Sequence, residues 1–126
     1  MAKHTGSDVA PNVYAAICPS REVLALIGEK WVSLIVGALD QRVLRFGELK
    51  RLCEGISQKM LTQSLRKMER DGLIVREVFD DELVLRVEYS LSPLGQTLIP
   101  VVSMAKMWAE ENLRIIEANR RVYDEQ

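Results

Sequence analysis

The stretch from residue 44 to residue 95 constrains the fold more than any other part of the chain. Residues 46–52 have the spacing of a short amphipathic helix, and a longer, basic helical pattern covers residues 57–70. Residues 73–79 and 83–91 then have the composition of strands, and the second alternates apolar with polar side chains. This order predicts a helix-turn-helix followed by a hairpin, the arrangement of a winged helix.

The residues between and after the two helices support this prediction. Gly55 supplies a turn, and Ser57 is a favourable N-cap for the second helix. Ile56 and Leu61 flank that cap with the spacing of a hydrophobic staple, which would set the angle at which the chain enters the helix. Gly72 is placed to end the helix in a left-handed conformation.

The second helix has one face suited to a core and another suited to a polyanion. At about 100° per residue, Leu61, Leu65 and Met68 share one side. The other side and the first turn carry the predicted DNA-binding residues, which are Ser57, Gln58, Lys59, Thr62, Gln63, Arg66, Lys67 and Arg70. Lysine and arginine contact phosphates or guanine edges, glutamine suits adenine, and threonine contacts bases or backbone. We therefore expect this helix to read the major groove of double-stranded DNA.

Net charge alone points away from nucleic acid, because the chain carries a formal charge of −1. The distribution of charge points towards it. Between Arg42 and Arg76 there are nine basic and four acidic residues, an excess of five positive charges. A local basic patch attracts an anionic partner even when the whole protein is acidic.

The hairpin is a weaker candidate for DNA contact. Its predicted tip is Asp80-Asp81-Glu82, which would repel a phosphate backbone. Arg76 and Arg86 lie nearer its base and are included among the predicted DNA-binding residues. The sequence leaves open whether the wing touches DNA.

The flanking segments complete the predicted domain organisation. Residues 1–16 read as an N-terminal arm whose order the sequence leaves open, and residues 17–126 as one domain. A helix begins at Pro19, carries the apolar residues Val23, Leu24 and Ile27, and ends at Gly28; residues 31–39 form a helix that is apolar nearly all round. A short strand is expected at residues 43–45.

A long terminal helix is predicted from about residue 93 to residue 123, with Pro100 bending or interrupting it. Its apolar stripe is Leu98, Val101, Val102, Ala105, Trp108, Leu113 and Ile116. So small a domain leaves little surface for this stripe to cover, so we expect it to form a dimer interface. The predicted fold is α+β and mainly helical, with a wing of two or three strands and flanking helices for dimerisation.

Composition limits the class of protein. The 126 residues are 48% hydrophobic and 28% charged, the balance of a soluble globular domain. The chain shows neither a membrane span nor a signal peptide, so a cytoplasmic location and no membrane partner are expected. The only histidine, His4, has no metal-ligand cluster around it, and no cofactor or metal is predicted. Two cysteines are too few for a disulfide-stapled fold.

Other functions remain as alternatives. A solvated helix face is the commonest role of charged helix residues, and a winged helix can also serve as a protein–protein interaction module that binds an acidic partner. An enzyme is disfavoured, because the sequence shows no nucleophile paired with a histidine, no metal cluster and no phosphate-binding glycine loop.

The sequence resembles the HxlR-type transcriptional regulators, a branch near the MarR group of winged-helix proteins. The motifs that carry the resemblance are Cys18-Pro19, IGEKW at 27–31, RFGEL at 45–49, GISQKMLT at 55–62, Leu65-Arg66, DGLI at 71–74, RVEYSL at 86–91 and Leu94-Gly95. The resemblance runs from Cys18 to about Trp108. The wing departs from the family pattern, since DDELVL stands where relatives often carry a proline-containing loop.

The resemblance implies a homodimeric regulator that binds an inverted-repeat operator. By position, residues 57–70 would enter the major groove, and the first and last helices would form the dimer interface. Members of the family commonly respond to electrophiles, oxidants or small metabolites. We therefore expect a repressor with a redox or small-molecule effector.

The two cysteines carry different expectations. Cys18 matches the sensor cysteine of several redox-responsive relatives, and its place before a helix start, near Arg21, favours the thiolate. The competing interpretation is a small residue that packs in the dimer interface. Cys53 lies at the end of the helix that precedes residues 57–70, the predicted recognition helix. Packing in the core is the better explanation of a cysteine at that apolar position.

Overall fold

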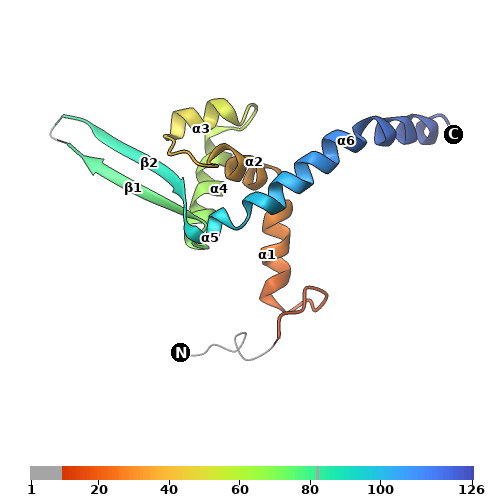
Figure 1. The fold of residues 1–126 in the computed structure, drawn as a ribbon, viewed down its shortest axis with the longest axis horizontal. Helices are drawn as coiled ribbons and strands as arrows, with labels where there is room; N and C mark the ends of the chain where they lie inside the picture. Colours follow the sequence, from red (N-terminus) through yellow and green to blue (C-terminus); the bar gives the residue numbers. More distant parts are fainter. Residues whose placement is uncertain (1–9, 82) are drawn as a thin grey trace.

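The computed structural model describes residues 10–81 and 83–126 (Figure 1). These residues form the helices α1 Pro19–Gly28, α2 Lys30–Ala38, α3 Phe46–Leu52, α4 Gln58–Arg70, α5 Pro93–Gln96 and α6 Ile99–Asp124, and the strands β1 Ile74–Asp80 and β2 Leu85–Leu91. A compact body holds α2 to α5, while the hairpin, α1 and α6 project from it in three directions (Figure 1). The predicted winged helix-turn-helix is confirmed. Most of the predicted N-terminal arm lies outside the described residues.

The core lies where α2, α3 and α4 meet. Ile35 of α2, Leu49 of α3, and Leu61 and Met68 of α4 are fully buried. Burying a side chain of this size stabilises the fold by about 1.5–3 kcal/mol. The inner face of α4 is therefore fixed against the body, which leaves its outer face in a defined position.

The predicted start of α4 is confirmed. Gly55 adopts a positive φ of 95°, which turns the chain between α3 and α4. The Ser57 side-chain oxygen accepts a hydrogen bond from the Met60 N–H at 3.1 Å. Ile56 and Leu61, the predicted staple residues, are both buried in the core. The entry of α4 is thus held by a cap and by apolar packing.

The predicted end of α4 is also confirmed. Gly72 has a φ of 77°, a conformation that costs glycine little. Its N–H donates to Glu69 O at 3.0 Å, and the Leu73 N–H donates to Met68 O at 2.9 Å. This pair of bonds is a Schellman motif, which satisfies the last carbonyls of the helix.

The wing is a two-stranded antiparallel sheet whose register runs from Ile74 opposite Leu91 to Asp80 opposite Leu85. The strand expected at 43–45 is reduced to a single bridge, in which Leu44 and Tyr89 exchange backbone hydrogen bonds of 3.0 and 2.8 Å. β2 begins at Leu85 rather than at the predicted residue 83. The reason is that Asp81 and Val84 bond to each other across the turn.

Burial is uneven along the apolar patterns of three helices. Val23 and Leu24 of α1 are 56% and 54% exposed, and Leu26 is the buried residue of that helix. In α2, Val32, Ile35 and Val36 are buried but Leu34 is 46% exposed. Leu52 of α3 is also exposed, whereas Cys53 is buried. A helical pattern identifies apolar residues, but a single chain does not cover all of them.

The interruption predicted near Pro100 is present. Ser92 caps α5 by accepting a hydrogen bond from the Gly95 N–H at 3.0 Å. The helix stops after Gln96, and α6 restarts so that Pro100 falls in its first turn. A proline is tolerated there because its missing N–H has no partner to lose. Across the described residues, no helix combines the length and apolarity that crossing a membrane requires.

Candidate nucleic-acid interface

The outer face of α4 presents the side chains predicted to read DNA. Gln58, Lys59, Thr62, Gln63 and Arg66 line one shallow depression of about 460 Å³. They recur at helical spacing, so a single face of α4 carries them all. Lys59 and Arg66 form no ion pair with any described residue. Their charges are thus available to an external anion.

Arg66 also reaches a second depression, of about 380 Å³, between α4, α3 and the base of the wing. Phe46, Thr62, Arg76 and Tyr89 are among the residues that line it. The fold therefore brings Arg76 of β1 next to the outer face of α4, although Arg76 is ten residues from Arg66 in the sequence. This end of the wing adds a cation to the surface of α4.

The prediction that Arg86 lies near the base of the wing was wrong, because the register places it opposite Phe79, beside the last strand pair before the tip. Its charge is not added to the surface of α4 in the same way. Arg86 donates from Nε to Glu88 Oε2 at 3.0 Å, and its guanidinium lies 3.7 Å from Asp81 Oδ2. It also lies over the Phe79 ring, 4.3 Å from the centroid. Arg86 is thus neutralised and held within the hairpin.

Lys67 is similarly engaged. Its Nζ lies 3.2 and 3.3 Å from the two carboxylate oxygens of Glu29, at the junction of α1 and α2. Arg70 lies beside it in a depression shared with α1. Sequence reasoning missed Glu29, because 38 residues separate it from Lys67 and no local pattern marks the pair.

Cys18 lies at the N-cap position of α1. The Asn12 N–H donates to its Sγ at 3.2 Å, and the Ser20 Oγ lies 3.1 Å from the same sulfur. The bond from the Asn12 backbone, then those from the Ser20 hydroxyl and backbone N–H, lower the pKa of the Cys18 thiol. The lowered pKa agrees with the expected thiolate preference, but its largest cause is the Asn12 N–H, which lies outside α1, and Arg21 is not among the causes.

Cys53 has the opposite environment. It is buried at 2% exposure in the core, and burial raises the pKa of its thiol. A buried, protonated thiol is a poor nucleophile. The core-packing interpretation of Cys53 agrees with this position.

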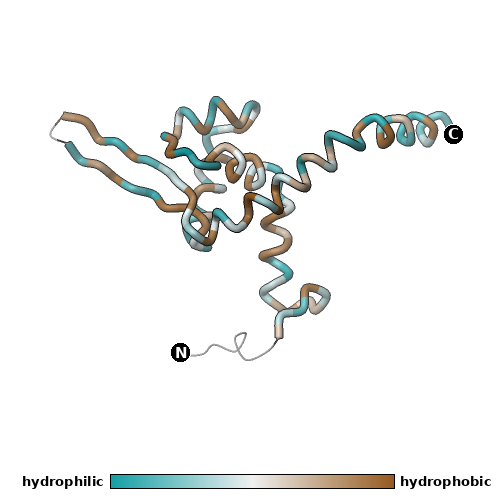
Figure 2. Tube along the Cα trace, viewed as in Figure 1, coloured by the Kyte–Doolittle hydropathy of each residue, from teal (hydrophilic) through white to brown (hydrophobic). Residues whose placement is uncertain are grey.

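α6 exposes most of its predicted apolar stripe. Trp108 is 60%, Val101 47% and Leu113 49% exposed, while Leu98 and Val102 pack partly against the core. Ala105 is exposed and Ile116 half-buried. Apolar segments recur along the projecting parts of both α6 and α1 (Figure 2).

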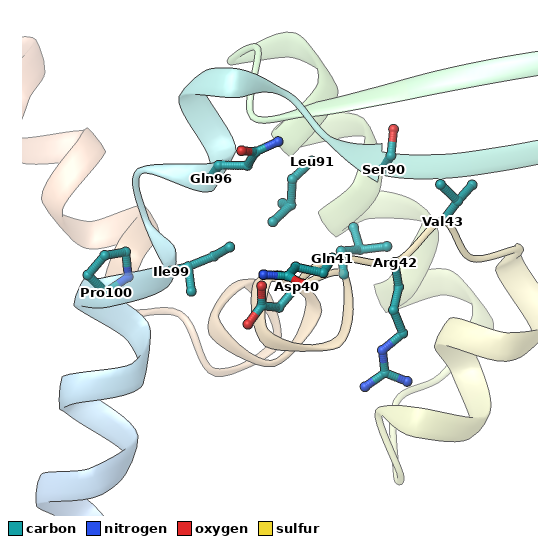
Figure 3. Close-up of a pocket in the computed structure, with 10 residues that line it drawn as sticks. Asp40, Gln41, Arg42, Val43, Ser90, Leu91, Gln96, Ile99 and Pro100 are labelled. Carbon is teal, nitrogen blue, oxygen red and sulfur yellow. The ribbon is translucent and has the colours of Figure 1, made fainter.

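A separate hollow of about 550 Å³ lies where the turn after α2 meets the end of β2 and the α5–α6 junction (Figure 3). Asp40, Gln41 and Gln96 contribute polar groups, and Ile99 contributes apolar surface. Arg42 extends away from the other side chains (Figure 3). This hollow lies on elements other than the recognition helix.

A basic helix held by a preceding helix, a turn and a wing defines the class of winged helix-turn-helix DNA-binding domains. The family model of the HxlR-like helix-turn-helix matches residues 26–117. The chain belongs to this family, as the sequence resemblance indicated.

Individual relatives agree with this assignment. The HTH-type transcriptional regulator YybR of Bacillus subtilis is 40% identical over 103 residues, which cover 82% of each chain. The solved structure of the transcriptional regulator ytfH from Salmonella typhimurium is 40% identical, with a TM-score of 0.81, over 89% of this chain and 99% of that one. The redox regulator HypR in its reduced form is 39% identical, with a TM-score of 0.72, over 79% and 98% of the two chains.

Proposed function

We propose that this protein is a homodimeric, sequence-specific transcriptional repressor, which binds an inverted-repeat operator in the cytoplasm through α4. The observation that carries the proposal is the outer face of α4, where Lys59 and Arg66 stand unpaired among the described residues beside Thr62 and Gln63. Cations on such a face contact phosphates, and glutamine and arginine read base edges.

Footprinting on the DNA upstream of the gene tests this function. We expect two protected half-sites about 34 Å apart, because a two-fold dimer presents its recognition helices to successive major grooves. Binding should weaken steeply as salt rises. A protein that shifts no duplex at physiological salt would instead favour the protein-interaction module.

The homodimer is supported by apolar surface that one chain leaves uncovered. α6 has 26 residues and so extends about 39 Å, and none of its residues is buried. Ile17 and Tyr14, just before α1, are 95% and 88% exposed. A second copy would cover these segments reciprocally.

Sedimentation equilibrium on wild type and Trp108→Ala tests the interface. Trp108 carries a large exposed apolar surface, so its truncation should weaken dimerisation. Glu117→Ala, a truncation of an exposed residue on the same helix, is the matched control. Equal dimerisation constants for the three proteins would remove α6 from the interface.

Redox control through Cys18 is supported by its lowered pKa and by the likeness to the redox regulator HypR. Its oxidation, as a mixed disulfide with a small thiol or as a bridge to the other subunit, would shift the two recognition helices and alter DNA affinity. A small metabolite is the alternative effector. Gel shifts with and without diamide, on wild type, Cys18→Ser and Cys53→Ser, test the idea. Identical responses of wild type and Cys18→Ser would exclude it.

A further inference from the structure

The side chain of Lys67 lies on the flank of α4, between the DNA-reading face and the face that packs in the core. It is four residues after Gln63 and three before Arg70, so it borders the DNA-reading face directly. Its ammonium group contacts both oxygens of the Glu29 carboxylate, at 3.2 and 3.3 Å. A carboxylate of the same chain therefore already holds the ammonium group that we expected to contact DNA.

Glu29 is held in place by the junction that it forms. It is both the C-cap of α1 and the N-cap of α2. Its N–H donates to Leu26 O, and its carbonyl accepts from the Ser33 N–H, each at 3.1 Å. The Ser33 hydroxyl in turn bonds to Ile27 O at 2.9 Å. The carboxylate thus extends from a fixed backbone rather than from a mobile loop.

The surroundings of the pair are acidic on the α1 side. A depression of about 220 Å³ brings Glu22 and Glu29 together with Lys67, Arg70 and Asp71. Three carboxylates therefore share this surface with two cations. Among the cations of α4, Lys67 forms an ion pair with Glu29, whereas Lys59, Arg66 and Arg70 pair with no described residue.

We propose that Glu29 is an internal competitor of DNA, which withholds Lys67 from the phosphate backbone and so limits sequence-independent affinity. The proposal rests on the proposed binding of DNA by α4. Both side chains are about half exposed, so the Lys67 ammonium group would be open to a phosphate once the Glu29 charge is removed. Cys18 occupies the N-cap position of α1 and Glu29 its C-cap position, so α1 joins the redox candidate to the recognition helix.

The test measures how affinity for a non-specific 30-base-pair duplex depends on KCl, by fluorescence anisotropy. In Glu29→Gln, Lys67 becomes free to neutralise a phosphate. The slope of log affinity against log salt should then steepen by about 0.9 for each bound subunit. At about 0.1 M salt, one such contact corresponds to roughly eight-fold tighter binding.

Three further variants separate this effect from a general change of charge. Lys67→Gln should leave the slope at its wild-type value, because Lys67 contacts no phosphate there. Glu29→Gln combined with Lys67→Gln should return the slope to wild type. Glu125→Gln removes one exposed carboxylate at the far end of the chain and should not steepen the slope.

An unchanged slope in Glu29→Gln, or a shallower slope in Lys67→Gln alone, would overturn the proposal that Glu29 competes with DNA for Lys67. A wild-type protein that binds no duplex would instead contradict the proposed function. Thermal melts of each variant show whether the fold is retained. The exposed position of the pair predicts melting temperatures close to wild type.

Discussion

The recognition helix and the wing come from one continuous segment, and both carry arginine, but the structure uses their charges differently. Arg66 of α4 forms no ion pair with a described residue and opens onto two depressions. Arg86 of β2 is held by Glu88, Asp81 and the Phe79 ring. We therefore expect a basic residue of this domain to contribute to DNA binding where the fold leaves its charge uncompensated.

The largest expected difference between α4 and the wing is in their contributions to the free energy of unfolding. Leu61 of α4 is fully buried, so Leu61→Ala should lower the free energy of unfolding by about 2–5 kcal/mol, through lost burial and the cavity left behind. Val78 of β1 is 46% exposed, and Val78→Ala should stay within about 0.5 kcal/mol. Urea denaturation measures both, and similar losses would show that the wing is part of the core.

The next largest expected difference between α4 and the wing is in their contributions to operator affinity. Arg66→Ala should cost about 1–3 kcal/mol on the cognate operator if Arg66 reads a base. Arg86→Ala should change operator affinity by less than about 0.5 kcal/mol, because its charge is already neutralised within the hairpin. Anisotropy titrations on one operator compare the two variants directly. Equal losses would mean that Arg86 exchanges its internal partners for phosphate.

The smallest effect concerns the thiol chemistry of Cys18, just before α1, and Cys53, just after α3. The pKa of Cys18 is lowered and that of Cys53 is raised. Iodoacetamide should therefore alkylate Cys18 at a pH below that needed for an ordinary cysteine, since the thiolate persists as pH falls towards the lowered pKa. Cys53 should react only on unfolding. Mass spectrometry of the native protein over a pH series resolves the sites, and faster labelling of Cys53 would reverse the assignment.

Much of the fold was predictable because its signals are local. Ser57 caps α4, Gly72 ends it and Pro100 falls where the last helix restarts, as expected. Each of these depends on a few neighbouring residues. The helical pattern alone did not show that Leu26 of α1 would be buried while Val23 and Leu24 stay exposed, because this depends on how α1 projects from the body (Figure 1).

For the candidate interface, sequence alone determined which residues share the outer face of α4, because helical periodicity alone places Lys59, Gln63 and Arg66 together. Only the tertiary structure decided which charges stay free. Glu29 reaches Lys67 from 38 residues away, and the hairpin register sets Phe79 opposite Arg86. Ion pairing and burial depend on long-range packing, which periodicity and capping do not encode.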